Sequence, residues 1–175
     1  ENSSLPMAEF SWKFKNTTNN NVDVSLCLNM SNPFLSESPD RSNTNGPVIN
    51  EFLHSGNLHG VKMYPAIDTL DHRYGELFFS TDAPGTEVKT TWYIGRWWDN
   101  SHDFWNDYSK DGRLEVNKTS TQNDGGQTTV SSLNVPLSLA PGDSVSIPFY
   151  ISWYMARRKL EANMAFDNEK PKEAI

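Results

Sequence analysis

The fold class is decided by residues 9–28, EFSWKFKNTTNNNVDVSLCL, where two alternating stretches flank a polar cluster. The apolar positions of the two stretches are Phe10, Trp12 and Phe14, and then Val22, Val24, Leu26 and Leu28. A period of two is typical of half-buried β-strands, and residues 16–21, NTTNNN, are good turn formers. The pattern therefore predicts an antiparallel hairpin, with Cys27 on the polar phase and without a special role.

Similar alternation predicts further strands at residues 58–64, 75–81, 87–93, 128–139 and 144–154. Residues 30–57 lack periodicity and contain several prolines and glycines, so we expect a long loop there. About seven short strands in series, joined by turn-rich loops, predict an all-β fold. The predicted architecture is an antiparallel β-sandwich with a short helical segment and long loops.

The helical segment is expected after Asn100-Ser101, which can cap a short helix through Tyr108. Phe104 and Tyr108 would then share one face at i, i+4, with Trp105 beside them. Asp111-Gly112 would close the segment.

Four strand residues carry specific expectations. Pro136 and Pro148 indicate edge positions or bulges, because proline cannot donate a hydrogen bond to a neighbouring strand. Trp12 and Trp153 fall in phase with apolar neighbours, which favours a purely structural role in the core.

Length and charge bound the function classes. The 175 residues suit one domain, which we assign to residues 1–154, with residues 155–175 as a charged tail or linker. The net charge of −7 argues against a nucleic-acid partner, since phosphate binding needs clustered Lys and Arg. No apolar run approaches the length of a membrane span. The single cysteine excludes an intrachain disulfide but leaves the compartment open.

Motifs for catalysis or cofactor binding are missing from the sequence. The candidate carboxylates are Glu76, Asp99, Asp103, Asp107, Asp111 and Glu115. We interpret those after Trp98 as a solvated acidic loop, because acidic side chains are exposed by default. No histidine pair has the spacing of a metal site, and neither a phosphate-cradling glycine loop nor a serine-nucleophile motif is present. The sequence therefore predicts no complete active site, no metal and no cofactor.

An aromatic cluster is the most suggestive feature. Its tryptophans and tyrosines lie between residues 92 and 108, and the candidate contact residues among them and their neighbours are Trp97, Trp98, Phe104, Trp105 and Tyr108. Aromatic faces can stack on sugar rings, but Trp and Tyr are also enriched in cores and domain interfaces. Of the two interpretations, we favour the structural one.

Three stretches resemble a known family. They are residues 3–12 (SSLPMAEFSW) with the following turn and strand, residues 104–108 (FWNDY) with 111–114 (DGRL), and residues 137–144 (LSLAPGDS) running into 147–153 (IPFYISW). In this order they are similar to the N-terminal region of glycoside hydrolase family 116. That family includes β-glucosidases, β-xylosidases and the non-lysosomal glucosylceramidase.

The resemblance implies a β-sandwich joined to a C-terminal catalytic (α/α)6 barrel that hydrolyses β-glucosides with retention. It also implies that the family's sandwich begins before Glu1, so that this chain lacks the first strands. No position matches the catalytic motifs of the barrel, so none is assigned.

Three hypotheses follow. In the first, the chain is a non-catalytic domain that supports the barrel, with residues 96–112 as the contact surface. In the second, it is a stand-alone module that binds β-glucosides or other carbohydrates through the same segment. In the third, it is a structural sandwich at a cell surface.

Overall fold

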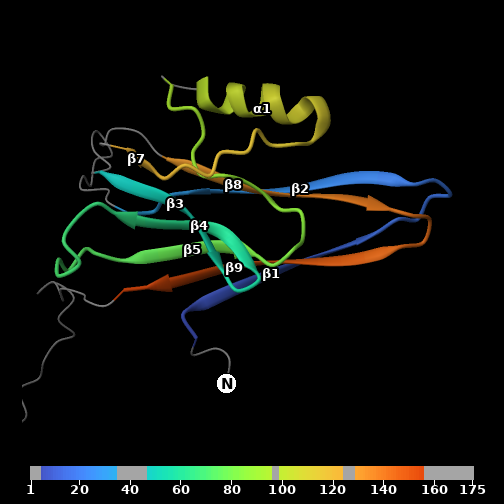
Figure 1. The fold of residues 1–175 in the computed structure, drawn as a ribbon. Helices are drawn as coiled ribbons and strands as arrows, with labels where there is room; N and C mark the ends of the chain where they lie inside the picture. Colours follow the sequence, from blue (N-terminus) through green and yellow to red (C-terminus); the bar gives the residue numbers. More distant parts are fainter. Residues whose placement is uncertain (1–4, 35–46, 96–98, 124–128, 156–175) are drawn as a thin grey trace, which may run out of the picture.

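The protein folds as two stacked antiparallel sheets, as the computed structural model shows for residues 5–34, 47–95, 99–123 and 129–155 (Figure 1). The six-stranded sheet has the order β1 (Met7–Lys15), β9 (Ser144–Tyr154), β5 (Glu76–Thr81), β4 (Leu58–Pro65), β3 (Val48–Ser55) and β7 (Thr121–Asn123). The three-stranded sheet has the order β2 (Val22–Ser31), β8 (Val130–Leu139) and β6 (Glu87–Lys89). The predicted all-β sandwich is confirmed.

The core lies between the two sheets and follows the period-two pattern. On β9, Ile147 and Phe149 point inward and are almost fully buried. Opposite them, Leu133 and Val135 point inward from β8 and are 0% exposed. Burying each such side chain contributes roughly 1.5–3 kcal/mol. Strands β8 and β9 therefore form the centre of the apolar core, as their alternation predicts.

A polar cluster also crosses the interior between the sheets. Asn50 of β3 is 0% exposed, and its amide nitrogen donates to Ser131 Oγ of β8 at 2.8 Å and to the Thr90 carbonyl at 3.0 Å. Its amide oxygen accepts from Asn32 Nδ2 at 2.7 Å. These partners satisfy the buried groups, which would otherwise cost about 1–3 kcal/mol each.

The predicted hairpin over residues 9–28 is wrong. β1 pairs with β9 and β2 pairs with β8, so the two strands belong to different sheets. The polar segment between them crosses from one sheet to the other, and Asn16 fastens it through a hydrogen bond from Nδ2 to the Leu139 carbonyl at 2.9 Å. Alternation shows that a strand has one buried face, but it does not identify the partner strand.

Two other strand predictions are corrected, and one further strand was not predicted. Residues 48–55 form β3 rather than part of a long loop, and Thr121–Asn123 form β7. The expected strand at 87–93 is shorter, since β6 ends at Lys89. The polar Asn50 on the inward phase of β3 concealed the alternation, because buried positions are usually apolar.

Neither proline lies on an edge strand, because β8 and β9 are both inner strands, but each lies beyond the end of one of its strand's two ladders. Pro136 of β8 is opposite Ser25 of β2, and the ladder between β8 and β6 ends before it. Pro148 of β9 is opposite Ser11 of β1, and the ladder between β9 and β5 stops at Tyr150. Each proline therefore has a paired strand on one side only. On the other side, the missing N–H of proline costs no ladder hydrogen bond.

The expected burial of Trp12 and Trp153 is wrong, although both have the predicted phase. Trp12 is opposite the buried Ile147 but is 48% exposed, and Trp153 is opposite Leu77 but is 39% exposed. β1 is an edge strand of the wider sheet, and among the described residues the three-stranded sheet does not cover its inward face. Position within the sheet, and not phase alone, decides burial.

The predicted helix is confirmed as α1 (Asp99–Asp111), which lies over the three-stranded sheet on the side away from the six-stranded sheet (Figure 1). Asp99 in the first turn and Lys110 in the last complement the helix dipole. Gly112 ends the helix at a φ of 69°, which favours glycine, and its amide donates to the Tyr108 carbonyl at 2.9 Å. The proposed tail at 155–175 lies outside the described residues apart from Met155, so the domain division stays a prediction.

Candidate functional site

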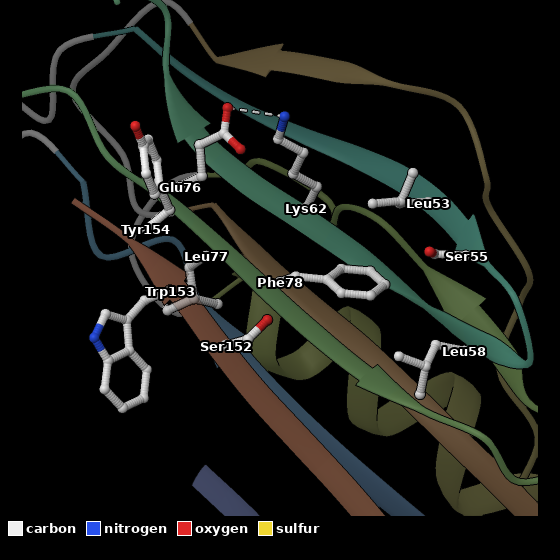
Figure 2. Close-up of a pocket in the computed structure, with 10 residues that line it drawn as sticks. All are labelled: Leu53, Ser55, Leu58, Lys62, Glu76, Leu77, Phe78, Ser152, Trp153 and Tyr154. Carbon is white, nitrogen blue, oxygen red and sulfur yellow. Dashed lines mark ion pairs between the residues drawn. The ribbon is translucent and has the colours of Figure 1, made fainter. Parts of the chain in front are cut away.

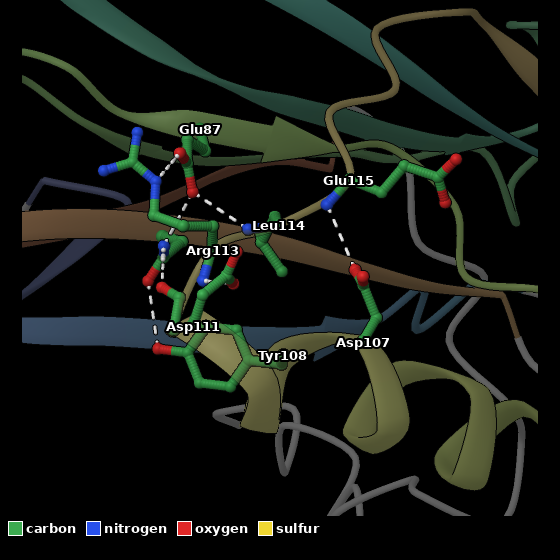
Figure 3. A network of polar contacts seen from close by, with 9 residues as sticks. Glu87, Asp107, Tyr108, Asp111, Arg113, Leu114 and Glu115 are labelled. Carbon is green, nitrogen blue, oxygen red and sulfur yellow. Dashed lines mark hydrogen bonds and ion pairs between the residues drawn. The ribbon is translucent and has the colours of Figure 1, made fainter.

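Helix α1 is fastened to the outer face of the three-stranded sheet by a polar network centred on Glu87 (Figure 3). Glu87 Oε2 accepts from the Leu114 amide at 2.9 Å and from Asn134 Nδ2 at 2.8 Å. Its Oε1 pairs with Arg113 Nε at 2.6 Å. Asn134 Oδ1 accepts from the Tyr108 hydroxyl at 3.1 Å. Charge-assisted hydrogen bonds of this kind are the stronger ones, so the end of α1 is held rigidly.

A stack of aromatic rings holds the middle of the helix. The Phe104 ring lies between Trp92 and Tyr108, with centroid distances of 4.2 and 5.5 Å. Trp92 Nε1 donates to Ser132 Oγ of β8 at 2.6 Å. Phe104 is 9% exposed, so it belongs to the contact between helix and sheet. The predicted shared face of Phe104 and Tyr108 is confirmed.

The candidate contact residues are therefore separated by the structure. Phe104 and Tyr108 face the sheet, whereas Trp105 points outward and is 62% exposed. Trp97 and Trp98 lie outside the described residues. The assignment of these five residues to a domain interface or to sugar contact stays a prediction, with Trp105 as its accessible member.

Glu87 and Lys89 were missed by reasoning from the sequence. Both are on the outward phase of β6, opposite Asn134 and Ser132 of β8. Charged residues on that phase indicate solvent exposure, but α1 and the chain after it cover them, so Glu87 is 9% and Lys89 is 6% exposed. The one feature of the sequence that hinted at their burial was the short spacing between Trp92 and the helix. This spacing does not show that the helix lies over β6.

A cleft of about 480 Å³ lies beside α1, between the helix, the end of β6 and the chain leading to β7. Its lining includes Lys89, Thr91, Tyr93, Ile94, Asp103 and Glu115. Lys89 Nζ and Glu115 Oε2 are 3.5 Å apart. Because Tyr93 and Ile94 are 57% and 40% exposed, one wall of the cleft is apolar and open to solvent.

A second hollow lies on the outer face of the six-stranded sheet (Figure 2). Lys62 Nζ of β4 pairs with Glu76 Oε1 of β5 at 2.9 Å, and the Tyr74 hydroxyl donates to the same oxygen at 2.5 Å. Leu58 and Phe78 supply apolar lining. The ion pair already satisfies the charged groups of this hollow, which makes it the weaker candidate for a ligand.

The carboxyl groups of Glu76 and Asp71 both have lowered pKa values. Burial raises the pKa of Glu76, but hydrogen bonds from Tyr74 and Lys62 outweigh it and lower the pKa. The hydrogen bonds of Arg73 lower the pKa of Asp71 to about 2. A glycosidase acid needs the opposite shift. Burial also raises the pKa of Cys27 to about 12, so its thiol is unreactive at neutral pH.

Residues 1–169 match the family described as "beta-glucosidase 2, glycosyl-hydrolase family 116 N-term". The chain belongs to this family. It is therefore an N-terminal domain of glycoside hydrolase family 116, as the three sequence stretches indicated, and its fold is the β-sandwich described above. No curated protein matches the chain.

Membership in glycoside hydrolase family 116 implies a parent protein with a catalytic domain. It does not favour the second hypothesis, that of a stand-alone carbohydrate-binding module. In the part of the chain that the structure describes, no helix is long and apolar enough to cross a membrane. Within the same ranges, no three His, Cys, Asp or Glu side chains are grouped so that they could hold a metal ion.

Proposed function

We propose that the chain is a non-catalytic domain that packs through helix α1 against the catalytic (α/α)6 barrel of the same parent β-glycosidase. The observation that carries the proposal is Trp105, which is 62% exposed on a helix that is otherwise fixed to the sandwich. A large aromatic side chain held at a rigid surface is typical of the centre of a protein interface. The domain would thereby support the barrel.

The rigidity of α1 strengthens this argument. Its aromatic stack and the Glu87 network hold the helix from one side, so the backbone that carries Trp105 is already ordered before binding. A pre-ordered backbone lowers the entropy cost of forming an interface. A docking surface on a free loop would lack this advantage.

The test is Trp105→Ala in the parent enzyme, with Trp12→Ala as the matched control. Trp12 is 48% exposed on β1, in the other sheet. Losing a central Trp of an interface costs about 2–4 kcal/mol. We therefore expect Trp105→Ala to lower the melting temperature of the parent and its β-glucosidase activity. The isolated 175-residue chain should keep its stability, because the side chain contacts solvent there.

Two outcomes would contradict the proposal. One is a Trp105 variant whose parent enzyme melts and turns over substrate like the wild type. The other is a larger loss in Trp12→Ala, which would place the docking surface at the open edge of β1.

A further inference from the structure

The cleft beside α1 contains a buried cation with an incomplete set of partners. The Lys89 side chain is 7% exposed, and an ammonium group has three donors to satisfy. Among the described residues its ammonium group has one ion pair, with Glu115 Oε2 at 3.5 Å, and that carboxylate side chain is 80% exposed. Buried charges are normally paired and hydrogen-bonded more fully. Lys89 therefore retains donors for a ligand.

Thr91 supplies a second, independent observation. Its Oγ1 is buried without a hydrogen-bond partner in the described part of the protein, and the residue lines the same cleft. An unpaired buried hydroxyl is costly, and such a group in a native structure calls for an explanation. A ligand with hydroxyl groups could both donate to this oxygen and accept from Lys89.

The charges and walls of the cleft select the ligand class. Among the described residues of the lining, one cation, Lys89, is accompanied by two carboxylates, Asp103 and Glu115, and this balance disfavours a phosphate or another strong anion. The same groups suit a neutral polyol, whose hydroxyls accept from the ammonium and donate to the carboxylates. The exposed ring of Tyr93 adds an apolar face for the carbon-bound hydrogens of a sugar ring. The volume, about 480 Å³, is within the range of roughly 300–1,000 Å³ that is usual for small-ligand sites.

We propose that this cleft is a subsite for a neutral β-glucoside or a short β-linked gluco-oligosaccharide, held by Lys89 and Asp103 and stacked on Tyr93. The choice of glucose as the sugar rests on the family, whereas the cleft itself rests on the geometry. The site lies at the start of α1 and the chain before it, while the docking proposal depends on Trp105. The two ideas can therefore fail separately.

The test is a calorimetric titration of the 175-residue chain with cellobiose, followed in parallel by tryptophan fluorescence. A small open site is expected to bind with a dissociation constant of about 1 mM. Tyr93→Ala should weaken binding by about tenfold or more, and Tyr154→Ala is the matched control. The two tyrosines are 57% and 59% exposed, and Tyr154 lies on the other sheet. Neither substitution removes a buried side chain, so both variants should fold.

A second variant, Lys89→Met, keeps most of the buried stem and removes the ammonium group. It should abolish the cellobiose signal while circular dichroism stays unchanged. The proposal is overturned if cellobiose gives no saturable heat or fluorescence change at about ten times the expected constant. It is also overturned if the two tyrosine variants bind alike, or if inorganic phosphate binds more tightly than cellobiose.

Discussion

Replacing Glu87 by alanine should release the end of helix α1 from the sandwich. Glu87 is 9% exposed, and its carboxylate holds the Leu114 amide, the Asn134 side chain and Arg113. The Leu114 amide would lose its partner in a buried place, which costs about 1–3 kcal/mol. Asn134 would keep the Gly112 carbonyl at 3.0 Å, so about 1 kcal/mol is a reasonable loss there.

The pair with Arg113 contributes less, because that guanidinium side chain is 55% exposed and such pairs are worth about 0–1 kcal/mol. The free energy of unfolding should therefore fall by about 3 kcal/mol in total. For a domain of this size that corresponds to a drop of about 6–12 °C in the melting temperature. Thermal unfolding followed by circular dichroism measures it directly.

Two further variants sharpen the result. Glu87→Gln keeps one acceptor oxygen and should lose less stability than alanine. Glu9→Ala removes an exposed carboxylate on β1 and should stay within about 0.5 kcal/mol of the wild type. If Glu87→Ala also stayed within that margin, the network would not be what holds α1, and the rigidity used in the docking argument would have to be abandoned.

Two other predictions concern the loop before β5 and the centre of β4. The folded pKa of Asp71 is about 2, below the ordinary value of 3.8, so its contribution to stability is complete above pH 3.8 and is lost as the pH falls to about 2. Asp71→Asn should remove that part of the acid dependence, which urea titrations at several pH values would reveal; an unchanged pH profile would contradict the assignment. Gly60→Ala should destabilise the domain by more than about 2 kcal/mol, because a Cβ there would lie 2.1 Å from the carbonyl oxygen of Phe79. The urea midpoint would test it, and a midpoint equal to that of the wild type would show that β4 and β5 can separate at no cost.

Much of the fold could be predicted from local patterns. Strands β4, β5, β8 and β9 could be located because their alternation is regular and turn formers separate them. β9 has the predicted bounds, Ser144–Tyr154. Pairing could not be predicted in the same way, since β1 and β2 are adjacent in sequence but belong to different sheets. Which strands pair is decided by residues that are far apart in the sequence, such as Phe10 and Phe149, which are opposite each other in β1 and β9.

The candidate site was predicted only in part. The aromatic segment was recognised, and Phe104 and Tyr108 share a face as expected. Lys89 and Thr91 were not recognised, because nothing in a short strand such as β6 shows that a helix will cover its outward face. Burial of a charged side chain is a property of the assembled layers, and the local sequence around it carries no record of it.

The Asn50 cluster in the interior has a consequence for how this domain can vary. Asn32, Asn50 and Ser131 come from three separate parts of the chain, and each satisfies a polar group of another. Replacing one of them by an apolar residue would leave its neighbours unsatisfied, whereas replacing the set together could be nearly neutral. Substitutions at these positions should therefore be strongly epistatic: a homologue that has lost one of the three residues should have lost the others as well.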